Sequence, residues 1–358
     1  MKLVLSNSIF FLQKIGGISR YFVNLSDEFD KKKIEYKIIA PISKNLYLKK
    51  KDKNKISLYF SNFPDNIFLT NLNNFLFNFF VKKFNPQILH ETYYSNNIKN
   101  FKRIKVLTIY DDIHEKYSLS YSKEQIEKKK KILDYIDHFI CISKYTQERF
   151  VESYNIPIKK TSVVYLSGAH IKKKLNYNHL IFTKYKLKKN NFFLFVGSRD
   201  KYKNFKLLND SLNICNKFKD LKVVCFGGGN FSKDELNKLS VNFINIQGGD
   251  GELKYLYENA FALVAPSLEE GFGITILEAM ELGCPVLCSD IKVFREIAGL
   301  APLYFSPYFE QDLIDKMEKI IFDNNKRDLM IKNGYEQCKY YSWKFCADET
   351  ERVYKSLL

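Results

Sequence analysis

Two glutamates eight positions apart, Glu270 and Glu278, stand in the segment PSLEEGFGITILEAMELGCPVLCSD. This pattern is typical of a strand end, a glycine-bearing loop and a helix, so Glu270 would lie in the loop and Glu278 about one turn into the helix. Gly271 and Gly273 would let backbone N–H groups approach a ligand at the helix N-terminus, where negative charge is favoured. Two such carboxylates suit pairs of sugar hydroxyls, although a capped surface helix with ordinary glutamates has the same spacing.

A cluster of cations follows an earlier strand, in the segment FVGSRDKYKNF. The strand would end at Gly197, and Arg199, Lys201 and Lys203 come directly after it. Cations at the carboxyl end of a strand, above a helix start, suit a diphosphate leaving group. A solvated loop of a lysine-rich protein is the alternative, and the glutamate segment favours phosphate binding.

A glycine pair near the N-terminus, Gly16 and Gly17, follows the first strand and opens a helix. Such a pair could lie under a pyrophosphate or let an acceptor approach closely. A plain strand-to-helix turn explains the pair equally well.

Length and composition favour two globular domains. The chain has 358 residues, of which 46% are hydrophobic and 27% charged, enough for two sizeable cores. No apolar run reaches the ~18 residues that a membrane span needs, and Ser6, Asn7 and Ser8 interrupt the signal-like start. The odd count of seven cysteines, with no metal-ligand spacing, predicts a cytoplasmic protein without a metal site.

The positive charge lies in one half of the chain. Residues 1–200 hold 37 Lys and Arg against 17 Asp and Glu, a balance of +20, whereas residues 201–358 hold 20 against 23. Such a field attracts lipid headgroups, pyrophosphates or nucleic acid. No nucleic-acid-binding module is recognisable, so peripheral contact with an anionic membrane through the basic half is predicted. General lysine enrichment remains the alternative.

Strand and helix patterns alternate twice along the chain, which predicts α/β units with parallel sheets covered on both faces. The expected strands are 2–6, 36–41, 87–92, 105–111, 138–143, 162–167, 192–197, 221–228, 241–248, 261–267, 284–289 and 302–307. The expected domains are an N-terminal domain at 1–168, a linker at 169–191, a C-terminal domain at 192–338 and a final helix at 339–358 that crosses back.

The glutamate segment resembles the E-x7-E signature of the retaining glycosyltransferases of the GT-B fold, glycosyltransferase family 4 in particular. The resemblance extends to the flanking P-S-x-x-E-G-F-G and L-E-A-M-x-x-G-x-P. It implies two Rossmann-like domains whose parallel sheets face each other across a cleft. It also implies that Glu270 contacts the hydroxyls of the donor sugar and Glu278 the ribose. Backbone groups facing sugar and phosphate would come from Gly271, Phe272, Gly273, Ile274 and Thr275.

Other segments resemble further parts of the same family. The lysine of its phosphate-binding G-x-x-x-x-x-K-N motif corresponds to Lys203, with Arg199 and Ser198 in the same loop. The first-domain glycine loop corresponds to Gly16 and Gly17. The three glycines at the end of the strand at 221–228, including Gly227, would lie near the base of the nucleotide.

One motif departs from the family pattern. Where the family often has a His-Asp pair whose histidine contacts the donor sugar, this chain has Tyr110 and Asp111. Asp111 could still bind a hydroxyl. Further candidates for acceptor or sugar contacts are Tyr110 itself and the nearby His114 and Glu115, which could substitute for the histidine. His90 and Glu91, at the end of a neighbouring strand, are candidates as well. A structural role in the core is the alternative for His90.

The resemblance implies transfer of a sugar from a nucleotide diphosphate without any metal or cofactor, with Arg199 and Lys203 neutralising the leaving group. The form G-S-R-x-x-Y-K-N-F resembles bacterial O-antigen mannosyltransferases, so GDP-mannose is the expected donor and a glycan or lipid-linked sugar the expected acceptor. Another GDP- or UDP-sugar is the main alternative, and a basic nucleic-acid-binding protein is a weaker one.

A stripe of large apolar residues in FLTNLNNFLFNFFVKKFNP recurs at helical spacing. Its members are Phe68, Leu72, Phe75, Leu76, Phe79 and Phe80. The stripe predicts either the core face of a Rossmann helix, which is the commoner case, or an interfacial membrane helix followed by Lys82 and Lys83.

Overall fold

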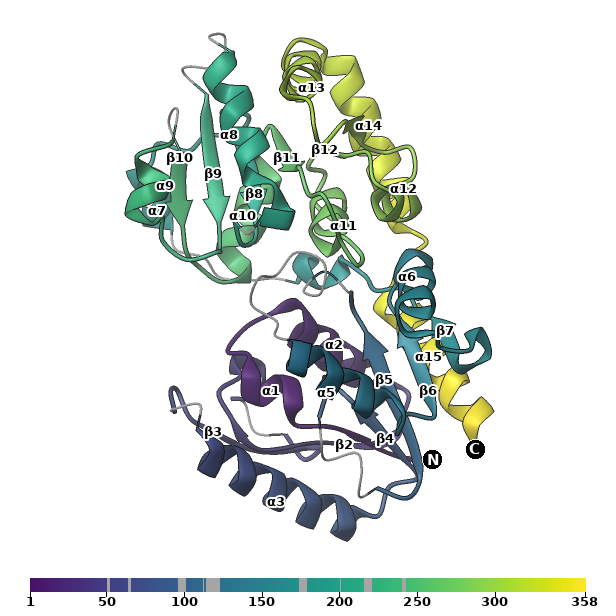
Figure 1. The fold of residues 1–358 in the computed structure, drawn as a ribbon. Helices are drawn as coiled ribbons and strands as arrows, with labels where there is room; N and C mark the ends of the chain where they lie inside the picture. The colour runs from purple at the N-terminus through teal and green to yellow at the C-terminus, as the bar shows by residue number, and fades with distance from the viewer. Residues whose placement is uncertain are drawn as a thin grey trace. The chain divides into compact units, whose positions relative to one another are not determined.

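The computed structural model describes residues 1–49, 52–63, 66–95, 101–111, 113, 123–173, 179–199, 201–215, 221–239 and 243–358. The chain divides into two compact units (Figure 1). Unit 1 comprises Met1–Leu166 and Trp343–Leu358, and unit 2 comprises Ser167–Ser342. Residues 169–191, which we expected to be a linker, belong to unit 2 and include the 3-10 helix η4 (Ala169–Lys172) and helix α7 (His179–Lys184).

Unit 1 is built on a seven-stranded sheet of order β3-β2-β1-β4-β5-β6-β7, and all its strand pairs are parallel. The strands are β1 (Lys2–Leu5), β2 (Glu35–Ser43), β3 (Lys55–Tyr59), β4 (Ile88–Glu91), β5 (Ile104–Ile109), β6 (His138–Cys141) and β7 (Thr161–Val163). The helices are α1 (Ser8–Leu12), α2 (Gly17–Lys31), α3 (Ile67–Phe84), α5 (Lys123–Leu133), α6 (Lys144–Tyr154) and α15 (Trp343–Leu357), with 3-10 turns η1 (Leu46–Leu48) and η3 (Ile158–Lys160).

Unit 2 carries a six-stranded parallel sheet of order β10-β9-β8-β11-β12-β13. The strands are β8 (Phe192–Val196), β9 (Lys222–Phe226), β10 (Phe243–Ile246), β11 (Ala262–Ala265), β12 (Val286–Ser289) and β13 (Leu303–Phe305). The remaining helices are η5 (Lys201–Lys203), α8 (Phe205–Ile214), α9 (Lys233–Leu236), α10 (Asp250–Asn259), α11 (Ile274–Glu281), α12 (Lys292–Ala298), α13 (Glu310–Phe322) and α14 (Asn324–Cys338).

The strands are near-continuous apolar runs because helices cover both faces of each sheet. In β8, FFLFV, the first four residues are buried. Phe193 and Phe195 pack with Leu208 of α8 and Met317 of α13 in the main core of unit 2. The twelve strands expected from the sequence all form. The additional strand β3 is a five-residue edge strand that follows a lysine-rich stretch, and its apolar pattern was too short to predict.

The last helix, α15, belongs to unit 1 and packs against α2. The Lys32 ammonium at the end of α2 pairs with Asp348 and Glu351 of α15. The buried rings of Tyr21 and Trp343 lie 6.3 Å apart, centroid to centroid. The C-terminal segment therefore completes the core of the unit in which the chain begins.

Both sheets change winding direction at a central strand pair. Strand order runs outward from β1 to β3 and from β4 to β7 in unit 1, and outward from β8 to β10 and from β11 to β13 in unit 2. Ligands of open parallel sheets bind at the carboxyl ends of the strands at such a switch point. The loops at these switch points are those after β1 and β4, and those after β8 and β11.

Candidate active site

Lys203 and Glu270 meet at the switch point of unit 2. Lys203 ends η5 in the loop after β8, and Glu270 lies in the loop after β11. The Lys203 Nζ donates to Glu270 Oε1 at 2.6 Å, and Ser267 Oγ donates to the same oxygen at 2.8 Å. About 16% of the lysine side chain and 14% of the glutamate side chain are exposed. A partly shielded ion pair of this kind leaves both groups within reach of a ligand.

The glycine loop before α11 follows from local backbone requirements. Gly273 caps the helix with a φ of 88°, a left-handed conformation that glycine adopts at little cost. A Cβ at this position would lie 2.8 Å from the ring of Phe294. The helix begins at Ile274 and Thr275, whose backbone N–H groups lie in its first turn and point toward its N-terminal end. Phe272 is buried, with its ring nearly perpendicular to that of Tyr341, and Gly271 is buried beside it.

Glu278 is held inside unit 2 by two neighbours that the sequence did not reveal. Only 4% of the residue is exposed. Its Oε1 lies 2.9 Å from His170 Nε2, and its Oε2 accepts a hydrogen bond from the Tyr257 hydroxyl at 3.0 Å. His170 comes from η4, inside the segment expected to be a linker. The fixed orientation of Glu278 is therefore set by η4 and α10.

The close packing of η4 against α11 depends on Gly168. A Cβ on Gly168 would lie 2.6 Å from the backbone nitrogen of Glu278 and 2.6 Å from the carbonyl carbon of Leu277. Gly168→Ala is therefore expected to lower the free energy of unfolding by about 1–3 kcal/mol, the usual cost of overpacking. Thermal unfolding of the purified variant measures this. Gly17→Ala is the control because its Cβ would meet nothing within 4 Å, and equal midpoints for the two variants would contradict the packing argument.

Arg199 is engaged away from the ion pair at Glu270. Its Nε donates to Glu235 Oε1 at 2.6 Å, and its Nη2 donates to the Asn230 carbonyl at 2.9 Å. Hydrogen bonds from this guanidinium lower the pKa of the Glu235 carboxyl to about 2. The guanidinium also lies over the Phe231 ring, 4.5 Å from its centroid. Of the two predicted cations, only Lys203 contacts Glu270; Arg199 ties the loop after β8 to the loop after β9.

The loop after β9 packs directly on the loop after β8. Gly227, Gly228 and Gly229 all have positive φ. A Cβ on Gly228 would lie 2.6 Å from the Gly197 carbonyl oxygen and 3.0 Å from the Ser198 Cα. The glycine run therefore allows the two loops to approach, which brings Ser198 and Gly227 to the same sheet edge as Lys203.

In unit 1, Gly16 and Gly17 stand at the N-terminus of α2, as the sequence predicted. Gly16 caps the helix, and Gly17 is exposed. The short helix α1 lies between β1 and this glycine pair. Asp111 follows β5 and accepts a hydrogen bond from the Ile113 backbone N–H at 3.2 Å. His114 and Glu115 lie outside the described residues.

Two of the residues predicted to contact sugar are core residues instead. His90 is fully buried, and its two ring nitrogens are hydrogen-bonded to the hydroxyls of Tyr354 and Thr108. Burial lowers its pKa to about 3, so the ring is neutral. Tyr110 is 9% exposed, and its hydroxyl donates to the Thr92 carbonyl at 3.3 Å. In this structure the polar groups of both side chains are hydrogen-bonded within unit 1, which favours a structural role for them.

Glu91 ends β4 as a buried carboxyl. It is 1% exposed, and its Oε2 accepts hydrogen bonds from Ser6 at 2.6 Å and Ser8 at 3.4 Å. Its Oε1 has no hydrogen-bond partner among the described residues. Burial raises the pKa of this carboxyl to about 7. Glu91 is therefore buried against the start of α1 in this structure, and its predicted sugar contact stays a prediction.

The raised pKa of Glu91 predicts a pH-dependent stability. Between the unfolded value of 4.5 and the folded value of about 7, the unfolded chain has lost a proton that the folded chain keeps. Stability therefore falls as pH rises through this window, by about 3 kcal/mol in total. Glu91→Gln should unfold like the wild type at pH 5 and at a higher temperature at pH 8. A difference that does not change with pH would contradict this assignment.

No group of three or more His, Cys, Asp or Glu side chains within the described ranges is arranged to hold a metal ion. None of the helices in those ranges is long and apolar enough to cross a bilayer.

Two family descriptions match this chain over adjoining parts. Residues 15–166 match "Glycosyltransferase Family 4", and residues 178–337 match "Glycosyl transferases group 1". Together the two matches span most of both units. The chain belongs to glycosyltransferase family 4. The family resemblance predicted from the glutamate segment is thereby confirmed.

Individual proteins similar to this family 4 chain are also named as glycosyl-transferring enzymes. It is 25% identical over 271 residues to O-antigen chain mannosyltransferase B of Escherichia coli, covering 73% of this chain and 70% of that protein. It is 32% identical over 193 residues to O-antigen chain mannosyltransferase RfbU of Salmonella typhimurium, covering 51% of each. The fold matches Anabaena Alr3699/HepE, solved in complex with UDP and glucose, with a TM-score of 0.77, 16% identity and full coverage of both chains. The α/β fold is GT-B, as predicted.

Proposed function

We propose that this family 4 chain is a retaining glycosyltransferase whose unit 2 binds a nucleotide-diphosphate sugar. The contact between Lys203 and Glu270 carries the proposal, because it pairs a cation suited to a diphosphate with a carboxylate suited to sugar hydroxyls at one switch point. In the free protein the two groups neutralise each other. When donor binds, Lys203 would turn to the diphosphate and Glu270 would accept hydrogen bonds from the sugar.

Glu278 would bind the ribose hydroxyls from its place in α11. Its contacts with His170 and Tyr257 support a fixed carboxylate, and a carboxylate whose rotamer is already set loses little entropy on binding. His170 and Tyr257 are then positioning residues. The first turn of α11, at Ile274 and Thr275, would add its N–H groups and the helix dipole to the phosphate.

Transfer would proceed without a metal ion. The negative charge that develops on the leaving diphosphate would be stabilised by Lys203 and by the N-terminus of α11, which are already oriented before reaction. The acceptor hydroxyl would attack from the side of the leaving group, and the leaving oxygen would take its proton, so the anomeric configuration is kept. Arg199 would support this step indirectly, by holding the loop that carries Lys203.

Unit 1 would hold the acceptor, a glycan or a lipid-linked sugar. Gly16, Gly17 and Asp111 follow strands at the carboxyl edge of its sheet. A cavity of about 230 Å³ lies after β1. Its polar lining consists of Asn7, Ser8, Thr70, Asn73, Asn74 and Ser95. Amides and hydroxyls without net charge suit a neutral sugar. We place the reaction in the cytoplasm, at the inner face of an anionic membrane.

GDP-mannose is our proposed donor, because the two O-antigen relatives are named as mannosyltransferases. HepE is described with UDP and glucose, which keeps a UDP-sugar as the alternative. A panel of GDP- and UDP-sugars, scored by the nucleoside diphosphate released, decides between them. Release from GDP-mannose supports the proposal. Release from UDP-sugars alone would overturn the donor, and no release from any sugar nucleotide would overturn the transferase activity.

A further inference from the structure

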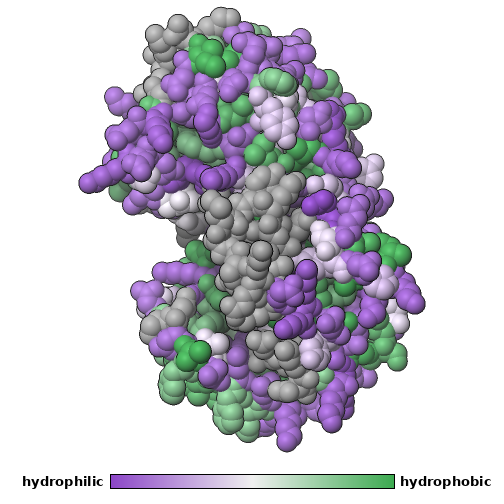
Figure 2. Space-filling view, viewed as in Figure 1, coloured by the Kyte–Doolittle hydropathy of each residue, from purple (hydrophilic) through white to green (hydrophobic). Residues whose placement is uncertain are grey.

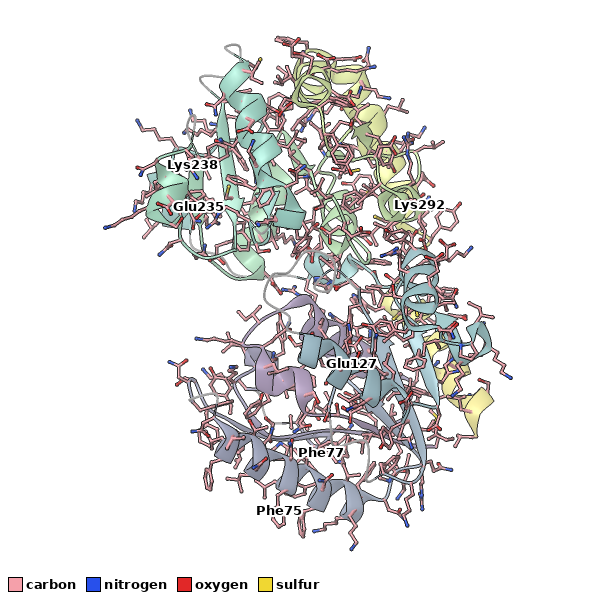
Figure 3. All side chains as sticks on the ribbon, in the orientation of Figure 1. Phe75, Phe77, Glu127, Glu235, Lys238 and Lys292 are labelled. Atoms are coloured by element: carbon pink, nitrogen blue, oxygen red, sulfur yellow. The ribbon has the colours of Figure 1, made fainter. Side chains whose placement is uncertain are left out.

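Helix α3 is apolar on two opposite sides, and only one of them is covered. Phe77 and Val81 pack with Val4, Ile39 and Leu89 in the core beneath the helix. The predicted stripe lies mainly on the other side: Phe68 is 71% exposed, Phe75 is 68% exposed and Phe79 is 55% exposed. Figure 3 shows Phe77 toward the sheet and Phe75 on the outer side of α3. The expectation that this stripe forms the core face was therefore wrong.

The exposed side of α3 forms one continuous band. Phe68, Leu72, Phe75 and Phe79 recur every three or four residues, which aligns them along one face. Hydrophobic residues gather over α3 at the lower end of the view in Figure 2. The helix contains no acidic residue, and Lys82 and Lys83 form its last turn. An apolar band of this length is uncommon on a surface that nothing covers.

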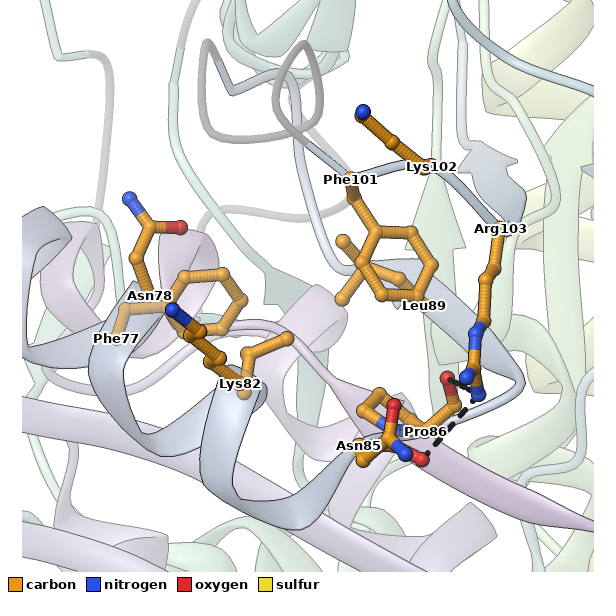
Figure 4. Close-up of a pocket in the computed structure, with 10 residues that line it drawn as sticks. Phe77, Asn78, Lys82, Asn85, Pro86, Leu89, Phe101, Lys102 and Arg103 are labelled. Carbon is orange, nitrogen blue, oxygen red and sulfur yellow. Dashed lines mark hydrogen bonds between the residues drawn. The ribbon is translucent and has the colours of Figure 1, made fainter.

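A basic pocket adjoins the end of this band. Its volume is about 380 Å³, and it lies between the C-terminal half of α3 and the segment before β5. Lys82, Lys102 and Arg103 contribute its cations, and Phe77 and Phe101 are among its apolar walls (Figure 4). The Arg103 guanidinium donates to the Pro86 carbonyl at 3.1 Å, which fixes it at the pocket edge. An anionic headgroup with part of its acyl chain suits such a lining.

We propose that the outer face of α3, together with this basic pocket, docks on a bilayer that contains anionic lipids. Aromatic side chains flanked by lysines are the features of a helix that lies in the membrane interface. The charge balance of +20 in residues 1–200 creates a positive field, which attracts an anionic surface. A second copy of the chain fits less well, because it would bring further lysines against Lys82 and Lys83. This inference deepens the membrane contact in the proposed function, although docking does not require sugar transfer.

Vesicle flotation of the full chain tests the docking surface. Wild-type protein should float with vesicles of phosphatidylcholine and phosphatidylglycerol, and far less with phosphatidylcholine alone. Phe75→Ser/Phe79→Ser should lower partitioning by at least ~10-fold through lost apolar burial. Lys82→Gln/Lys102→Gln should lower it by about 25-fold, because each lysine near the surface contributes a factor of about five. Circular dichroism confirms that each variant is folded.

Matched controls come from exposed residues elsewhere. Phe322→Ser removes a phenylalanine of α13 that is 77% exposed, and Lys159→Gln/Lys160→Gln removes two exposed charges of η3. Both controls should float like the wild type. If the α3 variants also float like the wild type, this surface is wrong while sugar transfer stands. Membrane docking is overturned if the wild type does not float with anionic vesicles, or if Phe75→Ser/Phe79→Ser instead abolishes a dimer. Donor turnover remains a separate test of the proposed function.

Discussion

Lys203→Ala is expected to lower the rate of sugar transfer by about 30- to 1000-fold, because one charge contact to a leaving diphosphate lowers the barrier by roughly 2–4 kcal/mol. The Lys203 ammonium contacts Glu270 at 2.6 Å in the free protein, and in the proposed function it would turn to the diphosphate when donor binds. Nucleoside diphosphate release under saturating donor and acceptor measures kcat directly.

Lys201→Ala is the matched control for this prediction. Lys201 belongs to the same 3-10 turn as Lys203, and its side chain is exposed. The control should keep the wild-type rate within about twofold, since a surface charge in water contributes little. A wild-type rate for Lys203→Ala, or equal losses for the two variants, would remove Lys203 from the site.

Glu270→Ala is expected to slow transfer strongly, to a residual rate that can still be measured, and to leave the fold intact. The substitution would remove both the proposed acceptor for the sugar hydroxyls and the carboxylate that Lys203 contacts, so the loss should be at least as large as for Lys203→Ala. Groups that act as one unit show non-additive losses. The double variant Lys203→Ala/Glu270→Ala should therefore be little slower than the worse single variant.

Glu258→Ala serves as the control for Glu270→Ala. Glu258 lies in the last turn of α10 in the same unit, and 44% of its side chain is exposed. It should retain full activity, and circular dichroism should be the same for both variants. Fully additive losses in the double variant would show that Lys203 and Glu270 act at separate places, against the shared site proposed here.

The strands and the main motif of unit 2 could be predicted from the sequence because the signals are local. Short apolar runs mark buried parallel strands, and the end of a strand fixes which sheet edge a residue reaches. Lys203 and Glu270 follow β8 and β11, so their meeting needed only the strand order. The contact of Arg199 with Glu235 could not be predicted, because no local sequence pattern indicates the direction in which a long side chain points.

Other features depend on packing that leaves no periodic signal. His170 lies in a stretch rich in lysine and asparagine, and it reaches Glu278 only because η4 packs on α11. His90 and Glu91 end a strand as expected. Successive side chains of a strand point to opposite faces of the sheet, and because both faces are covered here, both side chains are buried. In α3 both sides are apolar, and the sequence alone could not tell which one faces the sheet.

The transfer rate of the wild-type protein in excess EDTA, compared with the rate in Mg²⁺ or Mn²⁺, tests whether the donor site works without a metal ion. We expect rates that agree within about twofold, because Lys203 and the N-terminus of α11 would supply the positive charge that a metal ion otherwise provides. Loss of transfer in EDTA that either cation restores would contradict a donor site that neutralises the diphosphate with the protein's own groups.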